Sequence, residues 1–200
     1  YGTDIYGESK LCELLSQLCK IEGIEWIRTL YTYPERITDE LLQLIAKEEK
    51  LVKYLDIPIQ HACGEILKRM NRRGDKESLL ALVKKIRSTI PDVTLRTTLI
   101  TGFPGETDED FASSREFLAS IEPAFLHIFP FSERANTPAV DLPNKVQASV
   151  STARVKELES LSDALHYKFC SAAVGTTASV LFESTERGGY MTGFTGNYIK

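Results

Sequence analysis

The stretch LRTTLITGFPGETDEDF, residues 95–111, decides the fold of this chain. Its first part, 95–101, is mostly β-branched and apolar, which is typical of a strand buried on both faces. The run is broken at 102–105 by GFPG, a turn signal. Thr107 and Asp110 then form a capping-box pattern that predicts the start of a helix. Strand, turn and helix make half of a βαβ unit, and the turn lies where parallel sheets and barrels bind their ligands.

Helices and strands alternate along most of the chain. We expect helices over residues 9–21, 38–47, 65–70, 75–88 and from Thr107 onward, and strands over 26–32, 54–57, 95–101 and 125–131. This α/β rhythm favours a parallel sheet with right-handed crossovers. The second strand is expected to break at Pro58. Four strands are too few for a closed eight-stranded barrel, so we expect an incomplete barrel or an open sheet.

The pattern changes toward the end of the chain. A long amphipathic helix is expected from Lys145 to Phe169, and short strands follow Gly175 with a hairpin-like turn at 187–189. We therefore divide the chain into an α/β part over 1–144, a connecting helical segment over 145–175 and an all-β part over 176–200.

Composition limits the classes of function. The chain has 200 residues, 42% of them hydrophobic, and a formal net charge of −4, which predicts a soluble globular protein and disfavours a bulk polyanion binder. No apolar run is long enough for a membrane span, and no signal peptide is visible. Because the first residue is Tyr1, we expect a fragment of a longer protein. The densest basic patch comprises Lys68, Arg69, Arg72, Arg73 and Lys76, for which solvated helix faces are the ordinary explanation.

The cysteines do not predict a metal site. None of the four, Cys12, Cys19, Cys63 and Cys170, lies in a C-x-x-C or similarly tight pattern. Cys12 and Cys19 lie seven apart on an expected helix, a spacing that favours core packing. We therefore expect neither disulfides nor metal ligands within this sequence.

Several polar residues follow the expected strands. Gln60 can donate and accept hydrogen bonds, which suits a ribose or an amino-acid ligand. His61 is either a general base or a hydrogen-bonded structural residue. Arg96, inside an apolar strand, needs an anion, and a ligand carboxylate and the internal Asp56 are both candidates. Gly102 allows a ligand to approach the backbone closely. From the residues alone, the prediction is a ligand-binding half-barrel of unknown reaction, with no catalytic residue assigned.

Three segments together resemble the methylthiotransferases of the radical S-adenosylmethionine (SAM) superfamily. They are YLDIPIQHACGEILKRMNRRG (54–74), the opening stretch, and FPFSERANTPA (129–139). The segment 176–200 is similar to the first part of a TRAM domain, and DIPIQH points to the RimO branch, which modifies an aspartate of a small-subunit ribosomal protein. Three rivals stay open: a transfer-RNA adenosine (MiaB-like) methylthiotransferase, a non-catalytic SAM-binding module and a phosphate-binding barrel.

The resemblance implies the C-terminal part of an incomplete (βα)6 TIM-like barrel, followed by the start of a TRAM domain. It implies SAM and two 4Fe-4S clusters as cofactors, although the cluster cysteines of the family are absent from this sequence. It also implies a cytoplasmic enzyme, a flavodoxin-like electron donor and RNA contact through the TRAM domain, but no membrane. The implied SAM-binding residues are Gln60, Arg96, Ile100, Gly102, Glu106, Phe129 and Phe131, and the implied substrate-binding residues are His61 and Arg134.

Overall fold

Four parallel strands form the main sheet, in the order β1-β2-β3-β4. They are β1 (Ile27–Thr29), β2 (Leu51–Gln60), β3 (Thr94–Thr101) and β4 (Phe125–Pro130). The structure is a computed structural model that describes residues 1–200, except for the side chain of Arg187. Each strand lies beside its predecessor, as in barrels, whereas the strand order of a dinucleotide-binding fold reverses at a switch point. The predicted alternation of elements and the parallel sheet are thus confirmed.

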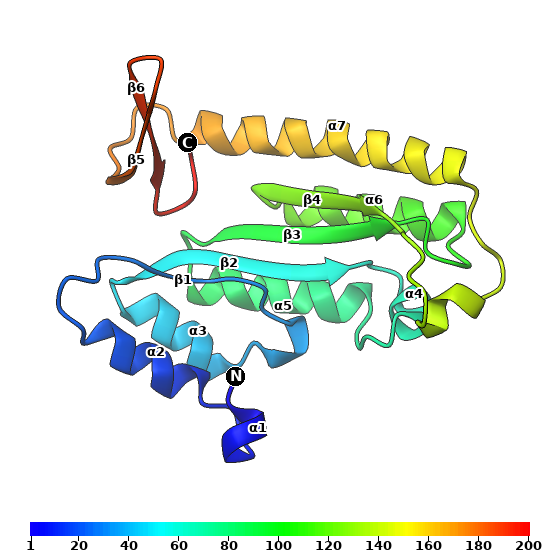
Figure 1. Cartoon of the computed structure of the whole chain (residues 1–200), viewed down its shortest axis with the longest axis horizontal. Coiled ribbons are helices and arrows are strands. Elements are labelled where there is room, and N and C mark those ends of the chain that lie inside the picture. The colour runs from blue at the N-terminus through cyan, green and yellow to red at the C-terminus, as the bar shows by residue number, and fades with distance from the viewer.

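Helices lie between and around the strands, and α5 and α6 cover one face of the sheet. They are α1 (Thr3–Tyr6), α2 (Leu11–Cys19), α3 (Asp39–Lys47), α4 (Gly64–Arg69), α5 (Lys76–Thr89), α6 (Asp108–Ile121) and α7 (Ala148–Ala172), with short 3-10 turns η1 (Pro34–Arg36) and η2 (Pro138–Asp141). In Figure 1 the arrowheads of β2 and β3 point toward α4, and α7 runs alongside β4. Among the described residues, no helix has the length and apolar character needed to cross a bilayer.

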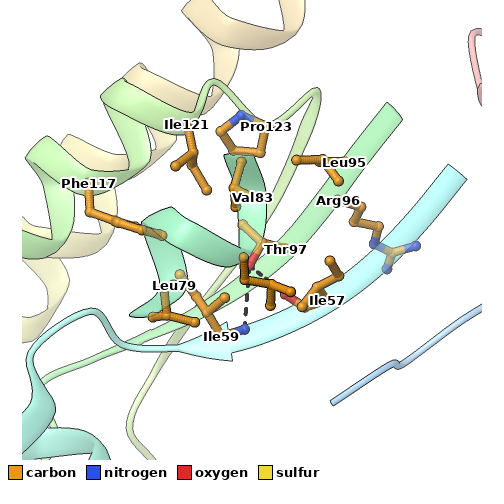
Figure 2. A pocket seen from close by; sticks show the side chains of 11 residues that line it. Ile57, Ile59, Leu79, Val83, Leu95, Arg96, Thr97, Phe117, Ile121 and Pro123 are labelled. Carbon is orange, nitrogen blue, oxygen red and sulfur yellow. Dashed lines mark hydrogen bonds between the residues drawn. The ribbon is translucent and has the colours of Figure 1, made fainter. Parts of the chain in front are cut away.

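The two faces of the sheet differ in their cover. Leu95 and Thr97 of β3 face Val83 of α5 and Phe117 of α6, and these side chains border a small apolar cavity (Figure 2). Arg96, between them in sequence, also borders the cavity, but its guanidinium extends away from the apolar side chains (Figure 2). The alternation follows from the period of two along a strand, which separates the helix-covered face from a more open one.

The prediction that β2 breaks at Pro58 was wrong, because the strand continues to Gln60. Its register against β3 shifts between Ile57 and Gln60. At this irregularity the Thr97 hydroxyl donates to the Ile57 carbonyl over 2.8 Å and accepts from the Ile59 amide at 3.5 Å (Figure 2). The Thr97 side chain thus forms hydrogen bonds with the backbone groups on either side of Pro58, so the strand continues through the proline.

Capping residues set the beginnings of α3 and α6 as predicted. The Thr107 side chain accepts from the Asp110 amide at 3.1 Å, and the Asp110 carboxylate accepts from the Thr107 amide at 3.0 Å. Thr38 caps α3 by accepting from the Leu41 amide at 3.2 Å. Each cap satisfies amides that the first helical turn leaves free, which fixes where the chain turns from loop to helix.

The end of the chain forms a second, two-stranded antiparallel sheet of β5 (Val180–Arg187) and β6 (Tyr190–Thr195). Its turn at Gly188 and Gly189 agrees with the predicted hairpin.

Beyond β6 the chain returns to the main sheet. The Tyr198 ring lies 5.2 Å from the Tyr54 ring, and the Arg28 guanidinium lies 4.1 Å from the centre of the Tyr198 ring. Arg28 also donates to the Gly196 carbonyl over 2.9 Å. These contacts cover the open face near the amino end of β2, opposite to the end that carries α4 (Figure 1).

Candidate functional site

The turn Gly102–Gly105 follows β3 at the carboxyl edge of the sheet. Gly102 has φ +74° and Gly105 has φ +85°, a left-handed backbone that side chains disfavour. The Gly105 amide donates to the Asn144 carbonyl over 2.8 Å, and the Phe131 amide donates to the Thr101 carbonyl over 2.7 Å. The turn is therefore held against the segment that follows β4.

Glu106 fixes the turn from within. Its side chain is 1% exposed, and its carboxylate accepts a hydrogen bond from the Gly102 amide. The Arg154 Nη1 atom lies 3.0 Å from Glu106 Oε2, and the His61 Nε2 atom lies 3.4 Å from Glu106 Oε1. A buried carboxylate with three donors is well compensated for its loss of water, so this acid locks the turn in one conformation.

His61 is fully buried beside the turn. Its Nδ1 atom accepts from the Cys63 amide over 2.9 Å, which leaves the proton on Nε2 to face Glu106. Ser114 of α6 lies 3.2 Å from Nδ1 and also accepts from the Ala62 amide at 3.2 Å. These contacts are those of the hydrogen-bonded structural histidine that the sequence left as one of two possibilities.

Helix α7 holds the turn from the other side. Arg154 pairs with Asp108 over 2.7 Å as well as with Glu106, and the Ser151 hydroxyl donates to the Thr101 carbonyl over 3.3 Å. A Cβ atom on Gly102 would lie 2.5 Å from Ser151 Oγ. Sequence reasoning missed Ser151 and Arg154. The signal that identifies them is their spacing, since both share a helix face with the buried Leu158.

Three of the predicted ligand residues lie at one level near the carboxyl edge of the sheet. The register pairs Gln60 with Leu99 and Ile100 with Phe129, so Gln60, Ile100 and Phe129 occupy neighbouring strands near their carboxyl ends. Phe129 is 52% exposed. Gln60 adopts φ +69°, a strained conformation for a residue with a side chain. This level offers an amide and two apolar side chains to a bound molecule.

Arg96 lies lower in the sheet. It is four residues before Ile100, which places it roughly 13 Å below that level at about 3.3 Å per residue. Its Nε atom is 3.7 Å from Asp56 Oδ2, and its Nη2 atom donates to His127 Nδ1 over 2.9 Å. Burial raises the pKa of Asp56, although the Arg96 charge opposes this shift. Of the two anions considered for Arg96, the structure shows the internal one.

The remaining predicted site residues do not join the Gln60 level. Phe131 packs edge-on against Phe103 at 5.0 Å and, with Gly102, lines a cavity of about 310 Å³ between the turn and α7. Arg134 is exposed in the loop after β4. The carboxylate of Glu106 and the ring of His61 are turned into the protein, as described above. Apart from Phe131 and Arg134, the predicted residues therefore form three groups: the level of Gln60, Ile100 and Phe129, the buried contacts around Glu106, and Arg96 in its ion pair with Asp56.

Comparison with known proteins identifies the class. Residues 2–118 match the family model described as the radical SAM superfamily, and the chain belongs to this superfamily.

Two relatives specify the similarity further. The chain is 46% identical, over 189 residues, to the ribosomal protein uS12 methylthiotransferase RimO of Alkaliphilus oremlandii, covering 94% of this chain and 43% of the relative. It is also 46% identical, over 183 residues, to the protein of the same name from Lachnoclostridium phytofermentans, covering 92% and 42%. The chain thus spans less than half the length of these relatives.

Among solved structures, the chain resembles coproporphyrinogen III oxidase (HemN) from Escherichia coli, a radical SAM enzyme. The TM-score is 0.61 at 20% identity, covering 78% of this chain and 36% of that structure. This likeness supports the α/β fold.

The superfamily implies SAM and an iron–sulfur cluster, and the structure fits the two differently. The level of Gln60 suits a nucleoside, because the half-exposed Phe129 ring and the Ile100 side chain provide apolar surface beside the Gln60 amide. By contrast, the described side chains contain no group of three Cys, His, Asp or Glu residues placed to hold a metal ion. The residues of this chain therefore do not fit a cluster.

Proposed function

We propose that this chain is part of a methylthiotransferase that modifies ribosomal protein uS12. The observation that carries the proposal is the 46% identity to a RimO protein across 94% of the chain. The reaction would add a methylthio group to the β-carbon of an aspartate. SAM, when bound, would supply the radical chemistry of the superfamily, whereas the cluster that opens SAM would be held by other parts of the protein.

In this proposal the four-stranded sheet is the C-terminal part of an incomplete barrel over residues 1–144. The sequential strand order supports this assignment, since a barrel adds its strands one after another. Residues 145–175 connect it to the start of a TRAM domain over 176–200. The separate antiparallel pair β5–β6 supports a change of domain there.

The chain's own residues would bind and orient SAM at the level of Gln60. Gln60 would hydrogen-bond the ribose or the amino-acid part, while Ile100 and Phe129 would contact the adenine. Gly102 and Glu106 would shape the turn beside it, and Phe131 would line the neighbouring cavity. Arg96 lies lower along β3 than Ile100 and pairs with Asp56 over 3.7 Å. It would therefore contact only a part of SAM that extends down the open face below Ile100. His61 would hold Glu106, and the exposed Arg134 would remain free for the protein substrate.

The proposed setting follows from the relatives' name and from the absence of a membrane-spanning helix among the described residues. The protein would act in the cytoplasm on the small ribosomal subunit, with a flavodoxin-like electron donor and RNA contact through the TRAM domain. The net charge of −4 favours a protein substrate over RNA.

The test uses the full-length protein, reconstituted anaerobically, with SAM, a reductant, and either uS12 or transfer RNA. We expect mass spectrometry to find one methylthio group on an aspartate of uS12 and none on the RNA. Modification of adenosine alone would show the transfer-RNA activity instead, and modification of neither would support a non-catalytic module. The 200-residue chain by itself is expected to take up no stoichiometric iron in the same reconstitution.

A further inference from the structure

A small cavity opens at the carboxyl ends of β1 and β2, beside Gln60. It has a volume of about 180 Å³ and is lined by Tyr31, Thr32, Tyr33, Pro58, Gln60 and Arg72. Sites for complete small-molecule ligands usually measure roughly 300–1,000 Å³, so this cavity suits one side chain better than a whole cofactor. The cavity lies at the carboxyl ends of the strands, where α/β barrels have their active sites.

Two lining residues on adjacent segments have strained backbones. Tyr31, two residues after β1, adopts φ +57°, and Gln60, the last residue of β2, adopts φ +69°. Left-handed conformations are uncommon for residues with side chains, and such outliers gather at ligand sites. The structure therefore maintains an unfavourable backbone on both sides of the same cavity.

Arg72 supplies the charge of this cavity. Its guanidinium lies 5.0 Å from the centre of the Tyr33 ring, and Nη1 donates to the Pro58 carbonyl over a long 3.5 Å. Arg96, Arg115 and Arg154 each have a carboxylate within 4.0 Å, but among the described side chains Arg72 has none. A guanidinium has five N–H donors in a planar fork that matches a carboxylate. Most of the donors of Arg72 are therefore free for a bound anion.

We propose that Arg72 binds the side-chain carboxylate of the substrate aspartate, in the cavity between Tyr31, Tyr33 and Gln60. This inference rests on the proposed function and adds the group that recognises the substrate. Because the carboxylate is bonded directly to the β-carbon, holding it fixes the position of the carbon to be modified. The same fork also discriminates against asparagine, whose amide is neutral and presents a single acceptor oxygen.

Within the basic patch, Arg72 lines the cavity and its neighbour Arg73 does not. Arg73, next to Arg72 on the same turn, is exposed and has no ion pair among the described residues. It offers a matched control, because Arg73→Gln removes the same charge from the same turn without touching the cavity.

The experiment measures binding of a uS12 peptide to the full-length protein, with aspartate or asparagine at the modified position. We expect Arg72→Gln to weaken binding of the aspartate peptide by about ten- to a hundred-fold, the worth of a charged hydrogen bond. Binding of the asparagine peptide should change by less than about three-fold on the same scale. Arg73→Gln should change neither, and Arg72→Lys should recover part of the affinity for aspartate.

The other possible results would each contradict a specific part of the proposal for Arg72. Equal weakening of both peptides, or of neither, would remove Arg72 from carboxylate recognition. Weaker SAM binding by Arg72→Gln without peptide would assign the guanidinium to the cofactor's carboxylate, and a loss confined to RNA would assign it to phosphate. A melting temperature of Arg72→Gln equal to that of the wild type excludes misfolding. If the wild-type protein binds and modifies no uS12 peptide, the proposed function fails, whereas normal modification by Arg72→Gln defeats this inference alone.

Discussion

The chain buries two carboxylates, Glu106 after the end of β3 and Asp56 in the middle of β2, and their surroundings differ. Glu106 is surrounded by the Gly102 amide, Arg154 and His61. Asp56 is equally buried at 1% exposure, yet neither of its oxygens has a hydrogen-bond partner among the described residues, and Arg96 lies 3.7 Å away. The difference teaches that burial alone does not define a site. A buried acid whose oxygens are hydrogen-bonded fixes the backbone around it. A buried acid without hydrogen-bond partners lowers the stability of the fold.

The largest expected effect comes from breaking the lock around Glu106. Arg154→Ala leaves a carboxylate buried without its ion partner, so we expect a loss of about 3–5 kcal/mol in the free energy of unfolding. Urea unfolding of the 200-residue chain measures it. Arg115→Ala is the control, because Arg115 pairs with Glu157 at 2.7 Å on the surface. A surface pair is worth about 0–1 kcal/mol, and similar losses for both variants would contradict the distinction.

A smaller loss is expected when the locked turn receives a side chain. Gly102→Ala combines a left-handed backbone with a Cβ atom 2.5 Å from Ser151 Oγ, and we expect a loss of about 2–3 kcal/mol. Adding Ser151→Gly should return the part due to the clash and leave the part due to the backbone. Gly105→Ala should cost less, because its contact is the flexible end of Arg69. Equal costs at both glycines would show that α7 does not confine the turn.

Replacing the poorly bonded acid should have little effect on stability. Asp56→Asn removes a charge that is costly to bury and loses only a long ion pair, so the free energy of unfolding should change by less than about 1 kcal/mol. Glu106→Gln in the same urea experiment should cost about 3 kcal/mol, as expected for a broken buried pair. A large loss for Asp56→Asn would mean that the two acids are equivalent after all.

The smallest effect concerns the pH dependence of the cluster formed by Asp56, Arg96 and His127. Partial loss of hydration and the Arg96 charge lower the pKa of His127, whose Nδ1 accepts from Arg96. As pH falls below the ordinary histidine value of about 6.5, the unfolded chain takes up the proton more readily than the folded one. This contribution to stability is therefore present above about pH 6.5 and declines below it.

The melting temperature of the wild type, compared with that of His127→Gln, should consequently fall between about pH 7.5 and 5.5. A difference that is constant over this range, or that rises as pH falls, would show that His127 does not titrate in this way.

The sequence carried much of the fold because its signals are local. The capping pattern of Thr107 and Asp110, the apolar run before Gly102 and the hairpin glycines each act through neighbouring residues, and the structure shows them as predicted. Pro58 shows the limit of such local rules. The hydroxyl that accommodates it belongs to Thr97, 39 residues further along the chain, where no rule for Pro58 would look.

The site was less accessible from sequence for the same reason. Gln60, Ile100 and Phe129 share a level because parallel register follows from strand ends, which the sequence indicates. The burial of His61 and Glu106 depends on Arg154, 48 residues beyond Glu106 on a helix whose polar residues resemble those of any surface. Likewise, nothing near Arg72 in sequence separates it from Arg73, since Tyr33 and Pro58 distinguish them only after folding.

The contact between Arg28 and Gly196 also bears on the order in which contacts form during synthesis of the chain. It joins residues 168 positions apart, whereas strands β1 to β4 pair over much shorter separations. A chain made from its amino end displays Arg28 long before its partner emerges from the ribosome. The closing contact comes late, and such long-range contacts form slowly, although each doubling of the loop adds only about 0.6 kcal/mol. During synthesis the sheet therefore passes through a stage in which the ring of Tyr54 is open to water and to other chains.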